Sequence, residues 1–437
     1  MKLQDIPRKV HFVGIGGIGM SGLAQYLAAN GYRVTGSDRK GNDRTDALSR
    51  LGVKIHIGHD KNNVADAEIV VRTSAVHNDN PEVTEAAARH IPVILREQLL
   101  GAVFNSFHTR IAVCGTHGKT TVTAMLHEIL SECGVSHTAL IGGVYHGNNC
   151  YLGGGVIVAE ACEYNRSFLN LNPTICVCVN AEYDHPDCYA DREEIREAFR
   201  TFMNNVQAGG TVVLPRELEY LDVASKRVFY DDVKAQNIRL TDGKAAFSAL
   251  YPDGSLQAVR LAVPGRHNVT NALVALAVSR LLGIDGSSAA EALSRFDGVD
   301  RRWTESRGVC RIVRDYAHHP TEIACAVDTA VSVTDGRVIC LFQPHTYTRT
   351  KAFLQEFADC FAKADKVAYL PVYSAREAPV AGADSQTLAR MAVQRGIDAE
   401  YVANFDEAVA WVKRTVNTDD LLLILGAGDV AEIADSL

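Results

Sequence analysis

Val113-Cys-Gly-Thr-His-Gly-Lys-Thr-Thr121 is the most informative segment of the chain. The apolar run Ile111 to Val113 precedes its first glycine and predicts a buried strand. Behind the loop, Val122 to Leu130 carries apolar side chains at helical spacing. A strand, a glycine loop and a helix in this order are the setting that a phosphate-binding loop requires.

The residue types inside this segment fit the same interpretation. Gly115 and Gly118 allow backbone N–H groups to approach an anion at the positive end of a helix. Lys119 can reach terminal phosphates, and the hydroxyl of Thr120 can bind Mg²⁺. Val113 stands where the longer form of the motif has glycine, so this is the shorter G-T-x-G-K-T form. A surface turn is the alternative, but the flanking strand and helix favour a nucleoside triphosphate site.

Bulk properties narrow the class of protein. At 437 residues the chain is long enough for about three domains. Its net charge of −8 argues against a nucleic-acid binder that relies on basic residues. The 11 cysteines show no C-x-x-C spacing, which is typical of reduced thiols in a cytosolic protein. No signal region opens the sequence and no apolar run approaches ~18 residues, so we expect a cytoplasmic protein without a membrane span.

A second glycine-rich turn lies near the N-terminus. Gly14, Gly16 and Gly19 follow a predicted strand and open a helix, and Asp38 comes later at a spacing near the ~20 residues typical of a ribose-binding carboxylate. This pattern is typical of NAD binding, but the same geometry suits any nucleotide diphosphate. Further strands at Tyr32–Thr35, Ile69–Ser74 and Pro92–Leu95 predict a small α/β domain over residues 1–104.

Acidic and imidazole groups follow two later strands. Glu160 ends the apolar run that begins at Val156, and Asp184 and His185 follow the strand predicted at Thr174–Val179. Open α/β sheets bind ligands at the carboxyl ends of their strands, so these groups are candidates for holding Mg²⁺ beside Thr120. The alternatives are a capping or ion-paired role for Glu160 and a hydrogen-bonded structural histidine at 185.

Two asparagines open a strongly apolar predicted helix. Asn268 and Asn271 are three residues apart and therefore share one helix face. They could act as plain N-caps, or they could face a nucleotide at the helix terminus, and the residues alone do not decide between these roles.

A third α/β unit is predicted from about residue 300. His318, His319, His345 and Arg349 lie at the ends of its predicted strands, where polar groups are more often site residues than core. Zinc binding by the adjacent histidines is disfavoured, because their side chains point in different directions and no further ligands follow.

Taken together, these motifs make the chain similar to the Mur ligases over nearly its whole length. The resemblance rests on eight ordered segments: GIGGIGMSG (14–22), GTHGKTT (115–121), EACEYNRSFL (160–169), NAEYDHPD (180–187), GRHNVTNALVA (265–275), GVDRR (298–302), DYAHHPTE (315–322) and FQPHTYTRT (342–350). The fold it implies is α/β in three domains: a Rossmann-like UDP-sugar domain (1–104), a central P-loop ATPase domain (105–299) and a Rossmann-like C-terminal domain (300–437).

The resemblance also implies a role for each candidate residue. The UDP-sugar group comprises Gly14, Gly16, Gly17, Gly19, Ser37, Asp38, Ser74 and His345. The ATP group comprises Gly115, Thr116, His117, Gly118, Lys119, Thr120, Thr121, Asn268, Asn271, Arg302 and Asp315. The metal ligands would be Thr120, Glu160 and His185, and the catalytic residues Lys119, Glu160, His185, His318 and Arg349.

The activity implied is ATP-dependent amide-bond formation in the synthesis of peptidoglycan precursors. L-alanine would be joined to the lactyl carboxylate of UDP-N-acetylmuramate through an acyl phosphate, with ADP and phosphate as products. The expected cofactors are ATP and two Mg²⁺ ions, for which Mn²⁺ could substitute. We expect no nucleic-acid partner and a monomer or weak homodimer. Either His185 or His318 would take the proton from the amine.

At some positions the residue differs from the one that is common in the family. Cys162 and Asn165 replace two carboxylates, which shifts the expected metal-binding role to Glu160 and Glu163. Thr346 stands where many relatives carry arginine, leaving Arg349 as the anion contact. Three alternatives remain: a ligase that recycles a murein tripeptide, a nicotinamide oxidoreductase, and a nucleotide switch without catalysis. The oxidoreductase would leave residues 115–121 and Glu160 unexplained.

Overall fold

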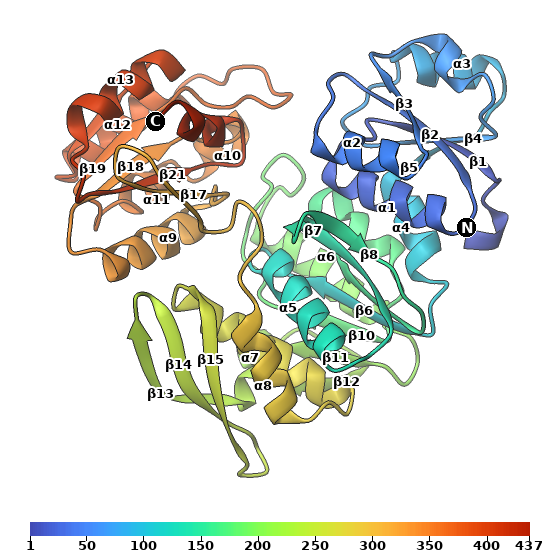
Figure 1. Cartoon of the computed structure of the whole chain (residues 1–437), viewed down its shortest axis with the longest axis horizontal. Helices are drawn as coiled ribbons and strands as arrows, with labels where there is room; N and C mark the ends of the chain where they lie inside the picture. The colour runs from blue at the N-terminus through green and yellow to red at the C-terminus, as the bar shows by residue number, and fades with distance from the viewer. The chain divides into compact units, whose positions relative to one another are not determined.

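The computed structural model describes residues 1–437 and contains four β-sheets (Figure 1). The chain divides into two compact units. The first comprises Met1–Ala181 and Glu197–Tyr230, and the second comprises Glu182–Arg196 and Asp231–Leu437. No helix combines the length and the apolar character needed to cross a bilayer.

The first sheet of unit 1 is entirely parallel, with strand order β3-β2-β1-β4-β5. Its strands are β1 (Lys9–Val13), β2 (Arg33–Asp38), β3 (Lys54–Ile57), β4 (Ile69–Arg72) and β5 (Val93–Leu95). The connecting helices are α1 (Ile18–Ala29), α2 (Asp43–Arg50), α3 (Pro81–Ala88) and α4 (Arg96–Phe104), with the 3₁₀ helices η1 (Leu3–Asp5) and η2 (Lys61–Val64). This is the α/β sheet that the sequence predicted for this segment.

The central sheet of unit 1 has strand order β12-β11-β10-β6-β9-β7-β8, and only β8 runs antiparallel to its neighbour. Its strands are β6 (Thr109–Cys114), β7 (His137–Tyr145), β8 (Asn148–Tyr151), β9 (Val156–Glu160), β10 (Ile175–Cys178), β11 (Thr211–Leu214) and β12 (Lys226–Phe229). The helices of this region are α5 (Lys119–Glu132) and α6 (Arg192–Asn204), with η3 (Tyr164–Asn170) and η4 (Arg216–Leu218).

The two sheets of unit 1 are joined by helix α1, which packs against β7 and β8. Asn149 on β8 is buried, and its Nδ2 donates to the carbonyl of Ile18 at 2.5 Å and to the Ser21 hydroxyl at 3.1 Å. These bonds hold the first turn of α1 against the central sheet. The glycine-rich turn before α1 therefore has a defined position relative to the phosphate loop.

Unit 2 begins its second segment with a small antiparallel sheet. Its strands are β13 (Lys234–Thr241), β14 (Lys244–Leu250) and β15 (Leu256–Pro264). Helices α7 (His267–Leu281) and α8 (Gly286–Arg295) follow, and both contact β15. The 3₁₀ helix η5 (Tyr230–Asp232) precedes β13.

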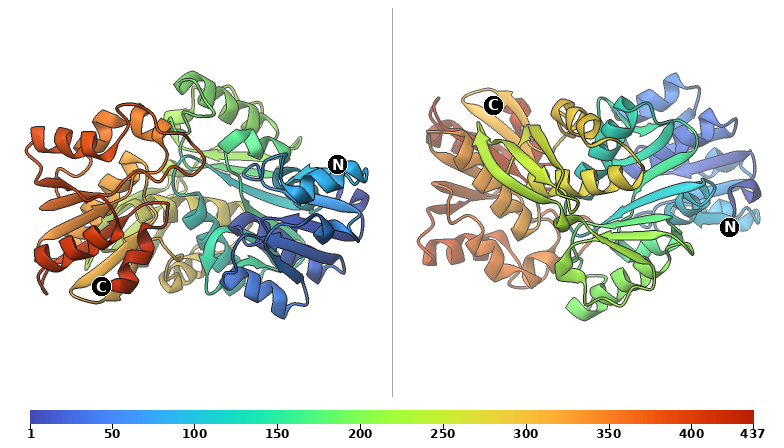
Figure 2. Two further views of the ribbon diagram at one scale, coloured as in Figure 1. Left: turned by 90° about the horizontal axis from the view of Figure 1, so that it is seen from above. Right: turned by 90° about the horizontal axis from the view of Figure 1, so that it is seen from below.

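The C-terminal sheet has strand order β16-β17-β21-β18-β19-β20, and only the edge strand β16 is antiparallel. Its strands are β16 (Thr304–Arg307), β17 (Arg311–Asp315), β18 (Val338–Phe342), β19 (Lys366–Tyr369), β20 (Ala399–Tyr401) and β21 (Leu421–Leu425). The helices are α9 (Pro320–Val333), α10 (Tyr347–Ala352), α11 (Leu354–Asp359), α12 (Ser385–Gln394) and α13 (Phe405–Thr415), with η6 (Val430–Ser436) at the end. Figure 2 shows helices on both faces of this sheet.

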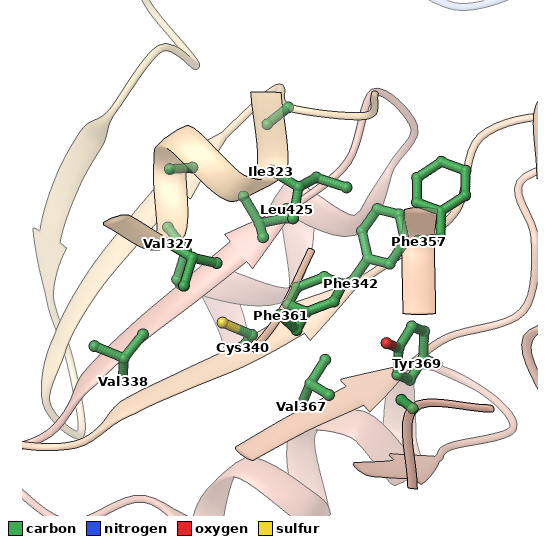
Figure 3. Packing of buried hydrophobic residues seen from close by; sticks show 14 of the residues in the cluster. Ile323, Val327, Val338, Cys340, Phe342, Phe357, Phe361, Val367, Tyr369 and Leu425 are labelled. Atoms are coloured by element: carbon green, nitrogen blue, oxygen red, sulfur yellow. The ribbon is translucent and has the colours of Figure 1, made fainter. Parts of the chain in front are cut away.

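The residues of β18 explain why both faces are covered. Val338, Cys340 and Phe342 point to one face, where they pack with Ile323 and Val327 of α9 (Figure 3). The intervening residues, Ile339 and Leu341, pack on the other face with Trp411 of α13. A strand that is apolar at every position must be buried on both sides, and parallel sheets with helical crossovers satisfy this requirement.

The parallel strands were predicted from the sequence, but short elements between them were not. The predicted helix after the phosphate loop begins at Lys119 rather than at Val122, and the second strand extends to Asp38 rather than ending at Thr35. Helix α2 and strand β3 were not predicted, since their few apolar residues carry little periodic signal. The α/β fold class is confirmed, whereas the predicted boundaries at 104/105 and 299/300 stay predictions.

Candidate functional site

The phosphate loop lies between the end of β6 and the start of α5. Gly118 is the N-cap residue of α5 and has φ = 80°. Gly115 has φ = 140°, and a Cβ atom on Gly115 would lie 3.1 Å from the backbone N of Asn180. Both positions therefore require glycine. Asn180 binds the loop from the end of β10, because its Oδ1 accepts the N–H of His117 at 2.9 Å and its Nδ2 donates to the His117 carbonyl at 3.1 Å.

Lys119 has an acidic partner inside the loop. Its Nζ lies 2.9 Å from Glu163 Oε2 and donates to the Thr116 carbonyl at 3.1 Å. The Glu163 side chain is 1% exposed. Burial lowers the pKa of Lys119, but the carboxylate of Glu163 more than offsets this and raises it above its ordinary value. Lys119 is therefore fully charged at neutral pH and is held where a phosphate can replace Glu163.

Thr120 and Glu160 meet at the same edge of the central sheet. Glu160 is the last residue of β9, which pairs with β6 so that Glu160 lies opposite Val113. The Thr120 hydroxyl donates to Glu160 Oε2 at 2.7 Å. A hydroxyl and a carboxylate side by side are oxygen donors of the kind Mg²⁺ prefers, so this pair fits the expected metal. The sequence prediction that these two residues lie together is consistent with this contact, while metal binding stays a prediction.

Gly142 on β7 leaves the space that the Glu160 carboxylate fills. A Cβ at this position would lie 2.0 Å from Glu160 Oε2 and 2.6 Å from its carboxyl carbon. We therefore expect Gly142→Ala to displace the carboxylate from Thr120 and to lower ATP-dependent turnover by about 10- to 100-fold, with a higher Mg²⁺ concentration for half-maximal rate. Steady-state rates in a Mg²⁺ titration measure this.

The control for this substitution is Gly154→Ala. A Cβ at Gly154 would meet nothing closer than Ser136 Oγ at 3.9 Å, so the activity should stay close to that of the unsubstituted chain. An unchanged Mg²⁺ requirement in Gly142→Ala would contradict the role given to the Thr120–Glu160 pair.

The glycine-rich turn of the first sheet is held by β2. The N–H groups of Gly14 and Ile15 both donate to the Ser37 carbonyl, at 2.8 and 3.0 Å, and the N–H of Gly16 donates to Asp38 Oδ2 at 2.9 Å. Asp38, predicted to bind a ribose, thus also supports the turn itself. The Ser37 side chain is fully buried and donates to Glu82, whereas Ser74 is exposed after β4. Their contacts with a ligand stay predictions.

A cavity of about 330 Å³ connects this turn with the candidate metal ligand. Gly17 and Gly19 line it from the start of α1, Arg96 lines it from the start of α4, and Glu160 and Cys162 line it from the end of β9 and the residues that follow. Burial raises the pKa of the Cys162 thiol to about 12, so this residue is not a thiolate nucleophile. The cavity therefore extends from the glycine turn to the Glu160 carboxylate.

Unit 2 contains a separate cluster built on a buried ion pair. Arg349 on α10 donates from Nε to Asp184 Oδ1 at 2.8 Å and from a terminal nitrogen to Oδ2 at 3.2 Å, and its side chain also contacts His185 Nδ1 at 3.4 Å. Both Arg349 and Asp184 are buried. Burial raises the pKa of Asp184, but Arg349 and His185 lower it well below its ordinary value. Asp184, which the sequence offered as a possible metal ligand, is therefore ion-paired with the guanidinium of Arg349.

Two further histidines join this cluster. The rings of His318 and His345 meet edge to face with centroids 5.9 Å apart, and His345 also stacks on Tyr373. Burial lowers the pKa of His318 to about 4 and that of His345 to about 3, and the Arg349 charge acts in the same direction. Both rings are therefore neutral at pH 7. His318 Nδ1 lies 2.9 Å from the Tyr316 carbonyl, which assigns its proton to Nδ1 and leaves Nε2 as an acceptor.

His319 has partners outside this cluster. It is the N-cap residue of α9, with its Nδ1 accepting the N–H of Thr321 at 3.3 Å and its Nε2 3.2 Å from the Tyr183 carbonyl. The adjacent histidines 318 and 319 thus have different partners, and the prediction against zinc stays a prediction.

The asparagines of α7 are not N-caps. Arg266 is the capping residue, and Asn268 and Asn271 lie inside the helix, so the capping interpretation is wrong. Asn268 Nδ2 donates to the Pro264 carbonyl at 2.7 Å, and Asn271 Nδ2 donates to Asn268 Oδ1 at 2.9 Å. These bonds orient both buried amides, and their contact with a nucleotide stays a prediction.

Arg302 lies just before β16, and Asp315 is the last residue of β17. Arg302 is 3.6 Å from Glu322 Oε1, and the Asp315 carboxylate accepts the N–H groups of Trp303 and Ala317, each at 2.8 Å. The pKa of Asp315 is raised above its ordinary value, because the effect of burial is larger than the opposing effect of the Arg302 charge. Asp315 thus fixes the turn that carries Arg302, and the role of both residues toward ATP stays a prediction.

The sequence analysis missed several residues that shape these sites. Asn180 is part of the segment NAEYDHPD, but the sequence analysis assigned it no function. Its position just after a strand could have indicated a site residue. Glu377 was not considered, but its carboxylate accepts the Thr348 N–H at 2.8 Å and so supports the helix that carries Arg349. No local pattern indicates this contact, because Glu377 lies in the long segment between β19 and α12. Arg96 was also missed.

Three family models match the chain in order. They are the Mur ligase family catalytic domain over residues 9–108, the Mur ligase middle domain over 113–279 and the Mur ligase glutamate ligase domain over 295–428. The curated UDP-N-acetylmuramate–L-alanine ligase of Agathobacter rectalis is 39% identical over 448 residues, which covers 99% of this chain and 98% of that protein.

Solved structures give the same result. The UDP-N-acetylmuramate-alanine ligase of Thermotoga maritima aligns with a TM-score of 0.82 at 29% identity, covering 98% of this chain and 97% of that one. The murein peptide ligase of Psychrobacter arcticus aligns with a TM-score of 0.74 over 99% of this chain and 98% of that one, but at 23% identity it shows the fold alone. By sequence and by structure, the chain belongs to the Mur ligase family.

Proposed function

We propose that the chain is an ATP-dependent ligase that joins L-alanine to the lactyl carboxylate of UDP-N-acetylmuramate. The observation that carries the proposal is the cavity of about 330 Å³ shared by the glycine turn at Gly17 and Gly19 and by Glu160. A sugar nucleotide whose pyrophosphate lies on the turn would bring its carboxylate toward the phosphate loop. The alanine ligases of Agathobacter rectalis and Thermotoga maritima support this substrate assignment.

The first chemical step would be activation of the carboxylate. Its oxygen attacks the γ-phosphorus of ATP, the bond from the γ-phosphorus to the bridging oxygen breaks, and ADP leaves with that electron pair. Lys119 neutralises charge on the transferring group, and Gly118 leaves the N–H groups of α5 open to phosphate oxygens. Thr120 and Glu160 would hold one Mg²⁺ ion and His185 would hold a second. Both ions, for which Mn²⁺ would substitute, would neutralise charge at the phosphates.

The second step would form the amide. The neutral amine of alanine attacks the acyl phosphate, and the tetrahedral intermediate collapses with loss of inorganic phosphate and of one amine proton. His318 offers an acceptor for that proton, since its Nε2 is free of hydrogen when Nδ1 faces the Tyr316 carbonyl. His185 would be the alternative acceptor if it does not hold the second metal ion. Arg349, held by Asp184, supplies the positive charge that a carboxylate of the amino acid requires.

The test is phosphate release from Mg-ATP in the presence of UDP-N-acetylmuramate, with single amino acids added in turn. We expect release that depends on both the sugar nucleotide and L-alanine, with one phosphate per amide formed. Release that requires the murein tripeptide instead of alanine would identify a recycling ligase. Phosphate release that neither acceptor stimulates would contradict ligase activity and leave a nucleotide-binding protein.

A further inference from the structure

Glu82 is a buried carboxylate for which the proposed reaction has no use. It lies on α3, its side chain is 0% exposed, and it follows Asn80 and Pro81, which open that helix. An isolated carboxylate in a protein interior is costly, so its retention needs a compensating set of donors. That set comes from β1, from β2, from the loop after β3 and from η2.

The donors converge on the two carboxylate oxygens. On Oε2, the Ser37 hydroxyl donates at 2.5 Å, and ring nitrogens of His59 and His11 lie at 3.4 and 3.5 Å. On Oε1, Asn63 Nδ2 donates at 2.6 Å and the N–H of Asp60 at 3.4 Å. Burial raises the pKa of Glu82, but the nearby His11 ring and the hydrogen bonds from Ser37 and Asn63 outweigh it and lower the pKa to about 2. Glu82 is therefore ionised at neutral pH.

The Ser37 contact links this carboxylate to the glycine turn. Ser37 is fully buried, its side chain binds Glu82, and its carbonyl accepts the N–H groups of Gly14 and Ile15. The next residue, Asp38, accepts the N–H of Gly16. Ser37 thus has its hydroxyl anchored in the interior while its backbone shapes the turn that would hold a pyrophosphate.

We propose that Glu82 is a positioning residue for the nucleotide-binding turn, acting through Ser37. The carboxylate fixes the Ser37 rotamer and the end of β2. The Ser37 carbonyl then holds Gly14 and Ile15, so that the N–H groups at the start of α1 face the ligand. This inference rests on the proposed function, because it takes the turn to be a site for a uridine diphosphate sugar. It gives a binding role to a residue that does not touch the ligand.

The experiment compares Glu82→Gln with the unsubstituted chain by calorimetric titration with UDP and, separately, with Mg-ATP. Glutamine keeps the volume but turns one acceptor oxygen into a donor that opposes the Ser37 hydroxyl or Asn63. We expect UDP to bind at least tenfold more weakly and Mg-ATP to bind within twofold of the unsubstituted chain. Glu68→Gln is the matched control, because Glu68 is an exposed acid of the same sheet paired with Lys9, and its UDP affinity should not change.

A double substitution tests the route through Ser37. If Glu82 acts through this residue, Ser37→Ala alone weakens UDP binding, and adding Glu82→Gln to Ser37→Ala produces little further loss. If the losses of UDP affinity caused by the two substitutions multiply in the double variant, Glu82 does not act through Ser37. Equal weakening of UDP and Mg-ATP would show a general loss of structure and would also overturn the proposal.

Two further outcomes are distinguished by the same titrations. Should Glu82→Gln fail to fold, Asn63→Ala removes one donor to the carboxylate without changing its charge, and we expect a smaller loss of UDP affinity at unchanged Mg-ATP affinity. Unaltered UDP binding in that variant would overturn the inference. Absence of UDP binding by the unsubstituted chain would refute the sugar-nucleotide assignment itself, whereas UDP binding that Glu82→Gln leaves intact would refute only the role of Glu82.

Discussion

Lys119→Ala is expected to reduce ATP-dependent amide formation by at least ~10³-fold, because it removes the positive charge that the loop would offer to the transferring phosphoryl group. In the structure this charge is already placed in the loop, where Glu163 holds it at 2.9 Å. Phosphate must displace Glu163 to bind Lys119, so the lysine would exchange one anion for another without leaving the loop. Single-turnover measurement of acyl phosphate or of released phosphate checks the loss.

Removing Lys119 also leaves Glu163 buried without its cation, which could unfold the loop. The double variant Lys119→Met/Glu163→Gln removes both charges and separates the two effects. It should recover the melting temperature lost in Lys119→Ala but not the activity. Lys54→Ala, at an exposed position of β3, serves as a control with normal rates. Turnover near normal in either Lys119 variant would contradict a phosphate-binding role for the loop.

Asp184→Asn is expected to have the second largest effect, and it should act on stability and on catalysis together. The substitution leaves the buried guanidinium of Arg349 without its carboxylate, and breaking one partner of a buried pair typically costs about 3–5 kcal/mol. The guanidinium would then move away from His345 and His185. We expect a lower melting temperature and a kcat/KM for the amino acid reduced by about 10²-fold, with ATP affinity nearly unchanged.

The double variant Asp184→Asn/Arg349→Met distinguishes these contributions. It removes the unpaired charge, so the free energy of unfolding should recover while the kcat/KM for the amino acid falls further. Asp253→Asn breaks the exposed ion pair with Arg280 and provides the control, with both quantities within experimental scatter of the unsubstituted chain. Full activity of Asp184→Asn would show that the position of Arg349 does not depend on this carboxylate.

Much of the fold could be predicted from local residues, since a strand buried on both faces is visible as an uninterrupted apolar run. Val338–Phe342 and Leu421–Leu425 are such runs, and both are central strands of the C-terminal sheet. The conformation of the loop at 115–121 was equally predictable, because its two glycines and the start of α5 lie within one short segment of the chain. Short edge elements such as β3 and β20 carry too few apolar residues to stand out.

The pairing of charged and polar groups could not be predicted from the sequence. Lys119 and Glu163 are 44 residues apart, Ser37 and Glu82 are 45 apart, and Asp184 and Arg349 are 165 apart. Nothing in the local pattern states which acid faces which base. Asp184 illustrates this, since its position after a strand suited a metal ligand as well as an ion pair.

The sequence by itself determined the parallel α/β architecture, the two glycine turns and the identity of the groups that could bind phosphate, because each depends on residues within a few positions of one another. Only the tertiary structure decided that Glu163 neutralises Lys119, that Asp184 holds Arg349 and that Glu82 anchors Ser37. These contacts depend on the order in which strands lie in each sheet, as when β6 lies between β9 and β10. Strand order is set by the sum of packing over the whole domain, and no single segment of the chain contains it.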